Sequence, residues 1–189
     1  MQVRLKILIT IIILIALFSA HLVNAQRNTT SRIRINSGDN IDFLFRTFND
    51  MQNGKSFNNW TTIYIYFNDT TPGPTPAGSG WQLEFRADDT DFVGVGGNTL
   101  NLAILELKAS GPATGPNGET ITYSNTTELQ DVDQVLILGD IQNQGNGPYS
   151  DNFFISYYCG QQISLGGESV WSQKGDYYNV NIIFTLSPQ

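Results

Sequence analysis

Short runs of alternating apolar and polar residues, separated by glycine, proline and asparagine, are the feature that most constrains how this chain can fold. The run 62–67 reads Thr-Ile-Tyr-Ile-Tyr-Phe, with isoleucines and phenylalanine on one side and tyrosines on the other. A strand places successive side chains on opposite faces, so each such run predicts one buried and one solvated face. Two antiparallel sheets packed face to face meet that requirement.

Further strands are predicted wherever the same alternation recurs. The clearest is 177–186, in which every second residue from Tyr178 to Leu186 is apolar or aromatic. The segment 48–55 differs, because two apolar residues stand three apart before Asn-Gly, which predicts a single helical turn. The remaining strands are predicted at 32–35, 41–45, 81–86, 100–108, 132–138 and 153–159.

Glycine- and proline-rich segments at 70–80, 110–119 and 142–150 predict exposed loops between these strands. The first holds three prolines and three glycines and has the composition of a domain linker. Neither half of the chain would hold enough strands to close a core by itself, so a single domain is predicted. The expected fold is all-β, a single antiparallel β-sandwich that is Ig-like or a jelly roll.

The first 25 residues have the parts of a secretory signal peptide. Two basic residues precede the apolar run 7–20, and Val-Asn-Ala ends at Ala25. An uncleaved membrane anchor is the alternative, but a span needs about 20 apolar residues and this run has 14. We therefore expect a signal peptide at 1–25 and a sandwich domain at 26–189. The domain would be exported to the cell surface, periplasm or extracellular space without a membrane span.

The chain is acidic, with 10 Lys and Arg against 17 Asp and Glu and a formal net charge of −7. Loss of Arg4 and Lys6 with the signal peptide makes the charge of the mature chain −9. Such a surface repels phosphate backbones, and no basic cluster offsets it, so nucleic-acid binding is not expected. Attraction to an anionic membrane is disfavoured for the same reason.

The only histidine, His21, lies inside the predicted signal peptide. The mature chain then has no imidazole for Ser/His/Asp or Cys/His catalysis, and one cysteine alone cannot make a zinc site. A single thiol cannot form an intramolecular bridge, so we expect Cys159 to be buried, with a reactive or bridging thiol as the alternative. The glycines of 94–97 predict a turn rather than a phosphate site, and no cofactor is expected.

Carboxylate chemistry remains open to this composition. Glycoside hydrolysis needs two Asp or Glu residues roughly 5 to 10 Å apart, and small secreted jelly-roll glycosidases resemble this chain in size and tyrosine content. Glu84 and Glu106 lie on predicted strands and are the candidates, although solvated charges on an outer face explain them equally well.

Calcium asks only for oxygen ligands, and Asp88, Asp89 and Asp91 are weak candidates for it. Their spacing does not match a calcium-binding loop, and short Asp-rich stretches commonly make turns. A turn is therefore the prediction, with calcium as the alternative and no metal site assigned.

Four aromatic residues are candidates for stacking on sugar rings: Tyr64, Tyr66, Tyr149 and Trp171. The first two face away from the apolar side of their strand, and the other two lie in glycine-rich loops. Cross-strand pairing on a solvated sheet face is the alternative explanation. Trp81 alternates with apolar neighbours and is expected in the core.

The C-terminal segment 175–186 reads Gly-Asp-Tyr-Tyr-Asn-Val-Asn-Ile-Ile-Phe-Thr-Leu. It resembles the terminal G-x-Y strand, followed by alternating aliphatics, of secreted pilin-like and spore-coat-U-like bacterial surface proteins. That resemblance implies an Ig-like sandwich displayed outside the cell. It also implies assembly with copies of itself or other surface proteins by strand donation, for which 31–35 is a short donor.

Together these observations favour an exported, non-catalytic β-sandwich with a structural or adhesive role at the cell surface, such as a pilin-like subunit. A secreted carbohydrate-binding module is the alternative, and a small jelly-roll glycosidase is the third hypothesis. The expected partners are copies of the chain, other surface proteins, or glycan.

Overall fold

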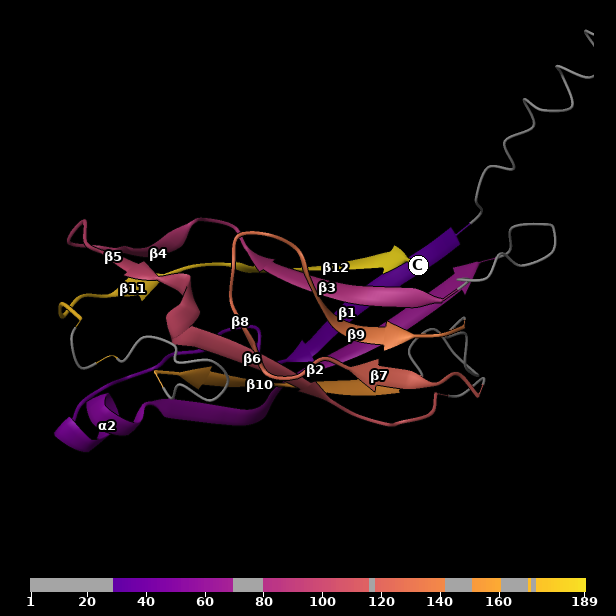
Figure 1. The fold of residues 1–189 in the computed structure, drawn as a ribbon, viewed down its shortest axis with the longest axis horizontal. Helices are drawn as coiled ribbons and strands as arrows, with labels where there is room; N and C mark the ends of the chain where they lie inside the picture. Colours follow the sequence, from indigo (N-terminus) through magenta and orange to yellow (C-terminus); the bar gives the residue numbers. More distant parts are fainter. Residues whose placement is uncertain (1–28, 70–79, 116–117, 142–150, 161–169, 171–172) are drawn as a thin grey trace, which may run out of the picture.

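Figure 1 shows the computed structural model of the chain, which describes residues 29–69, 80–115, 118–141, 151–160, 170 and 173–189. Strands dominate these residues, and the predicted all-β class is confirmed. The predicted signal peptide and the loop at 142–150 lie outside them. Among the described residues, no helix is long and apolar enough to cross a membrane.

The strands form two large antiparallel sheets and one small one. The first sheet has the order β1 (Thr29–Ser37), β2 (Lys55–Asp69), β10 (Asp151–Cys159), β6 (Leu105–Ser110) and β8 (Thr127–Glu128). The second has the order β12 (Ile182–Pro188), β3 (Trp81–Ala87), β9 (Gln134–Gly139) and β7 (Ile121–Tyr123). The third consists of β11 (Tyr178–Asn179), β4 (Asp91–Gly94) and β5 (Thr99–Asn101).

The two large sheets are connected by strands that pass repeatedly from one sheet to the other. Apart from β1 and the small sheet, successive strands from β2 to β12 alternate between the two large sheets. Antiparallel pairs β2–β10, β3–β9 and β6–β8 join strands that are nested in the sequence. This nesting resembles that of a jelly roll and differs from the strand order of an Ig sandwich, and β1 and β12 lie at neighbouring edges of the two sheets.

The core lies between the two large sheets. In the run 62–67 the isoleucines and phenylalanine are completely buried while the tyrosines are half-buried, and 81–87 alternates in the same way. Trp81 belongs to this core, as predicted, and meets Phe153 edge-on with ring centroids 5.8 Å apart. Burial of each such large apolar side chain stabilises the fold by roughly 1.5–3 kcal/mol.

The predicted strand at 41–45 is wrong, although its alternation is real. The odd-numbered residues of this segment are half-buried and pack against the core, but the backbone pairs with none of the strands that the structure describes. Side chains hold it instead: Phe43 lies 5.1 Å from Phe57 between ring centroids, and the Trp60 indole donates to the Asn40 carbonyl at 3.1 Å. Alternating burial therefore occurs here in an extended segment without a ladder.

The predicted helical turn is confirmed as α2 (Phe48–Asn53). Thr47 caps it, because its side chain accepts a hydrogen bond from the Asp50 N–H at 3.1 Å and the Asp50 carboxylate accepts from the Thr47 N–H at 3.2 Å. Gly54 ends it with a φ of 68°.

Two predicted strands are each divided. The segment 177–186 becomes β11 and β12, which belong to different sheets, because Asn181 bonds to Asp88 through its N–H at 2.9 Å and its side-chain amide at 2.6 Å. The segment 100–108 is interrupted by the 3₁₀ turn η1 (Leu102–Ile104), where the Asn101 side chain accepts from a backbone N–H. Side-chain hydrogen bonds thus compete with the ladder at both breaks.

Candidate functional site

The outer face of the first sheet brings together exposed and half-exposed side chains from three neighbouring strands. We call the set Arg32, Arg34, Tyr64, Tyr66 and Phe154 the tyrosine face. The arginines are exposed, and the three aromatic residues are half-buried. The register pairs Arg34 with Tyr64 and Arg32 with Tyr66.

The pattern of the strands forces these side chains outward. In β1 the arginines alternate with Ile33 and Ile35, of which Ile33 packs against the core. Residues two apart on a strand are separated by about 7 Å, and directly opposite residues have Cβ atoms roughly 5 Å apart. The two arginines and two tyrosines therefore form a two-by-two array. Phe154 extends it across β10, opposite Thr62.

One residue of β2 next to this face has a left-handed backbone conformation. Asn59 has a φ of 50°, and it sits between the part of β2 that pairs with β1 and the part that pairs only with β10. Its N–H donates to the Ser156 hydroxyl at 2.9 Å, and its side-chain oxygen accepts from the Ser110 hydroxyl at 3.0 Å. Asparagine tolerates this left-handed conformation better than most residues do, which suits it to the position.

Two glutamates lie on the outer face of the first sheet, on β6 and β8. Glu106 lies opposite Glu128 in the register, and only 2% of Glu106 is exposed. Glu84 instead lies on the outer face of the second sheet, where it accepts a hydrogen bond from the Ser187 hydroxyl at 3.0 Å. The two glutamates considered for glycoside hydrolysis therefore face opposite sides of the sandwich and do not share a site.

Of the candidate calcium residues, Asp88 and Asp89 lie in the bend between β3 and β4, and Asp91 is the first residue of β4. The Asp88 carboxylate binds Asn181, whose side-chain amide and then backbone N–H lower the pKa of Asp88. The Asp89 carboxylate accepts from the Thr90 N–H at 2.7 Å, as in a local turn. Within the described residues, no three His, Cys, Asp or Glu side chains form a group that could hold a metal ion.

Two of the four aromatic candidates, Tyr149 and Trp171, lie outside the described residues. The other two, Tyr64 and Tyr66, are side by side on one face, as the alternation of their strand predicts. Sequence reasoning missed Arg32, Arg34 and Phe154 as their neighbours. Alternation within each predicted strand could have placed these three side chains on an outer face. It could not show which strands are neighbours, because strand pairing is set by the topology.

Cys159 is buried, as expected, with 8% exposure at the C-terminal end of β10. Burial raises the pKa of its thiol to about 12, so the reactive thiolate is suppressed at neutral pH.

Asp176 is a structural anchor that sequence reasoning also missed. It lies just before β11, and its carboxylate accepts from the Asn98 side-chain amide at 2.9 Å and the Gly96 N–H at 3.0 Å. The glycine turn between β4 and β5, predicted at 94–97, is thereby tied to the small sheet.

No protein-family model matches this chain, and no curated protein matches it either. Function is therefore inferred from the geometry of the tyrosine face.

Proposed function

We propose that this chain is an exported, non-catalytic adhesive module that binds glycan at the cell surface through the tyrosine face. The observation that supports it is a set of three half-exposed rings, Tyr64, Tyr66 and Phe154, on neighbouring strands of one outer face. Strands β2 and β10 also bury other aromatic rings completely in the core. The three rings of the tyrosine face, by contrast, stay half-exposed on the outer surface.

Aromatic rings on a sheet face suit a sugar chain for two reasons. Each ring offers a flat apolar surface, against which the C–H face of a sugar can stack, and the tyrosine hydroxyl adds a polar contact at the ring edge. Arg32, Arg34 and Asn152 supply polar side chains next to the rings. Binding sites combine apolar contact with a few polar groups that fix orientation, and this face has both.

The arrangement favours an extended ligand. Phe154 lies opposite Thr62, four positions along β2 from Tyr66, which places the outer rings about 14 Å apart along the strands. That distance suits a short stretch of polysaccharide lying across the sheet.

Glycan-array screening of the mature protein, followed by calorimetry on any ligand found, tests the proposal. We expect Tyr64→Ala and Tyr66→Ala each to weaken binding roughly 2- to 10-fold, the loss of one ring contact. Tyr177→Ala is the matched control, because Tyr177 is 75% exposed just before β11, away from the tyrosine face. No binding across a broad array, or equal effects of all three variants, would contradict the proposal.

Assembly by strand exchange is a second candidate function, favoured by the position of β1. This strand forms one edge of its sheet, is joined to α2 by 38–47 without strand pairing, and directs only Ile33 and Ile35 inward along its central part. Ile35 is still 43% exposed. A strand held by so few buried side chains costs little to exchange for the β1 of a second copy.

A further inference from the structure

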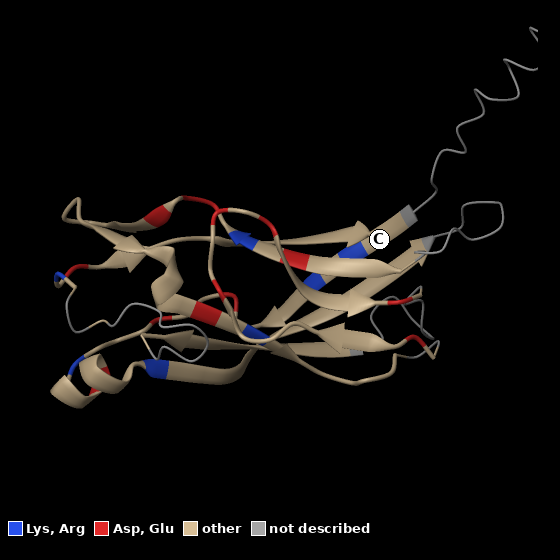
Figure 2. Ribbon diagram, in the orientation of Figure 1, with Lys and Arg blue, Asp and Glu red and all other residues tan. Residues whose placement is uncertain are grey.

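Basic side chains gather on the tyrosine-face side of an otherwise acidic protein. Arg32 and Arg34 on β1 and Lys108 on β6 are exposed there, and Figure 2 shows blue along β1 and on β6. Of the two glutamates that β6 and β8 place on this face, Glu106 is almost completely buried and only Glu128 is half-buried. The accessible charge of this face is therefore positive, while the whole chain has a formal net charge of −7.

The position of the two arginines relative to the rings indicates what kind of ligand group they could bind. Each lies directly opposite a tyrosine in the β1–β2 register, so the two arginines are spaced along β1 as the two tyrosines are along β2. A sugar stacked on a ring would present a carboxylate or sulfate at its edge, within reach of the arginine beside it. Arginine binds such planar groups through two parallel hydrogen bonds, which lysine cannot do.

Protection of the sheet edge does not by itself explain this charge. Charged side chains on an edge strand discourage pairing with other chains, and lysine is the one most used for that purpose, whereas β1 has arginines. In a chain with 17 acidic and 10 basic residues, acidic side chains would be the more available choice. Two arginines in alternation beside two outward tyrosines therefore point to a ligand of negative charge.

We infer that the tyrosine face selects anionic glycans, chains of uronic acids or sulfated sugars, over neutral ones. The inference rests on the proposed glycan-binding function and adds the ligand class to it. The remaining acidic surface repels a polyanion, so binding is confined to the one face where positive charge is accessible.

The experiment compares oligogalacturonate with galacto-oligosaccharides of equal length, which lack the carboxylates, by calorimetry on the mature protein. Wild-type protein is expected to bind the acidic oligomer at least about 10-fold more tightly, with an affinity that falls as salt is raised from 50 to 300 mM, as screening of charge pairs requires. The double variant Arg32→Gln/Arg34→Gln is expected to lose about that factor for the acidic oligomer only.

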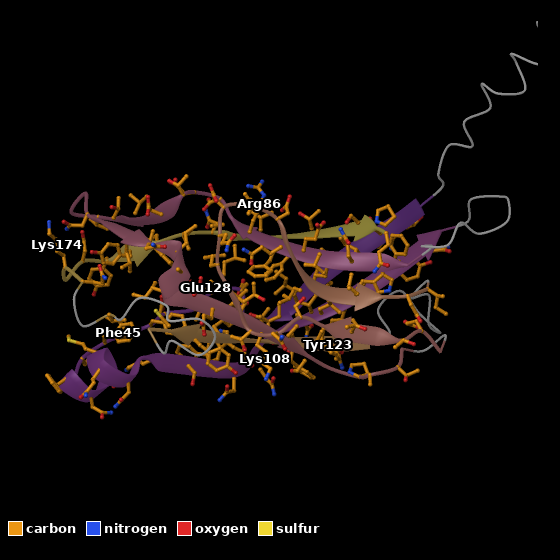
Figure 3. All side chains as sticks on the ribbon, in the orientation of Figure 1. Phe45, Arg86, Lys108, Tyr123, Glu128 and Lys174 are labelled. Atoms are coloured by element: carbon orange, nitrogen blue, oxygen red, sulfur yellow. The ribbon has the colours of Figure 1, made fainter. Side chains whose placement is uncertain are left out.

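Two further variants test where the positive charge must lie and whether charge alone is sufficient. Arg86→Gln removes a half-exposed positive charge on β3, whose guanidinium pairs with Asp133 at 3.4 Å, and Figure 3 shows Arg86 and Lys108 pointing to opposite sides of the molecule. The Arg86→Gln variant is expected to leave the affinity for the acidic oligomer unchanged. Arg32→Lys/Arg34→Lys retains charge without the paired hydrogen bonds and is expected to give an intermediate affinity. Thermal unfolding of each variant shows whether it is folded.

The outcomes distinguish the two proposals. Equal affinity for the neutral and acidic oligomers, with no effect of the arginine variants, overturns the inference while loss of binding in Tyr64→Ala still supports glycan stacking. Acidic binding that depends on the arginines but not on the tyrosines supports the charge selection and overturns the stacking proposal. If neither these oligomers nor sulfated ones bind, both proposals fail.

Discussion

At the residue scale, Asp176 makes the stability of the chain depend on pH. Hydrogen bonds, first from the Asn98 side chain and then from the Tyr177 N–H, lower the pKa of Asp176 from its ordinary value of 3.8. A carboxylate whose folded-state pKa is depressed contributes stability that is present above pH 3.8 and is lost as the pH falls through the folded value.

We therefore expect Asp176→Asn to lower the thermal unfolding midpoint at pH 7, with a difference from wild type that shrinks as the pH falls from 4 to 2. Thermal unfolding followed by circular dichroism across this range is the measurement. Asp131→Asn, at an exposed position on the loop before β9, is the control for loss of one negative charge. A wild-type advantage that stays constant down to pH 2 would show that the Asp176 hydrogen bonds do not depend on its ionisation.

The residues of the tyrosine face differ in how far the sequence reveals them. Tyr64 and Tyr66 could be placed outward because alternation within one run is local information. Arg32 and Arg34 could be placed on one side of β1 for the same reason. Their position opposite the tyrosines depends on the β1–β2 register across more than 25 intervening residues, which no local pattern specifies.

At the scale of elements, the left-handed conformation of Asn59 in β2 is expected to affect both the stability of the fold and the orientation of the tyrosine face. We expect Asn59→Ala to lower the free energy of unfolding by about 2 kcal/mol, the sum of a left-handed backbone cost for alanine and one lost hydrogen bond. Asn59→Gly loses the same contact with Ser110 but accepts a φ of 50° without strain, so it should cost less.

Urea denaturation of both variants measures this difference, and glycan binding by Asn59→Ala shows whether the left-handed conformation also orients the rings. Ser110→Ala is the matched control, because it removes the hydroxyl that donates to Asn59 and leaves the backbone of β2 unchanged. If alanine and glycine at position 59 were equally destabilising, the backbone conformation would not be the cause.

The local alternation pattern is not sufficient to predict where strands pair and where they end. The runs 62–67 and 81–86 were predictable because both faces of each strand have a constant environment along their length. The segment 41–45 has the same alternation without a partner strand, and 177–186 is divided by Asp88, a residue 93 positions away from Asn181. Pairing and breaks of this kind depend on long-range contacts rather than on the residues of the segment itself.

At the scale of the whole molecule, the sandwich places β1 at a sheet edge that a second copy can reach. The strand starts near the same end of the sandwich as the C-terminus, while α2 and the small sheet lie at the opposite end (Figure 1). It is an edge strand of its sheet, and its side chains contribute both the arginines of the tyrosine face and one flank of the core. Exchange of β1 between copies would therefore rebuild the tyrosine face from two chains without changing its residues.

A pair of cysteines tests whether that exchange occurs. Thr30 and Asn68 are direct partners in the β1–β2 register, and cross-strand partners lie within the Cα separation that a disulfide tolerates. In Thr30→Cys/Asn68→Cys, oxidation of a self-paired chain yields a monomer with an internal bond, whereas exchanged strands yield covalent multimers. We expect a ladder on non-reducing gels that increases with protein concentration during assembly. Thr30→Cys alone, which can give only dimers, is the control, and the buried Cys159 thiol does not compete. Monomer alone at every concentration would show that β1 stays on its own chain and that adhesion, if it occurs, involves single subunits.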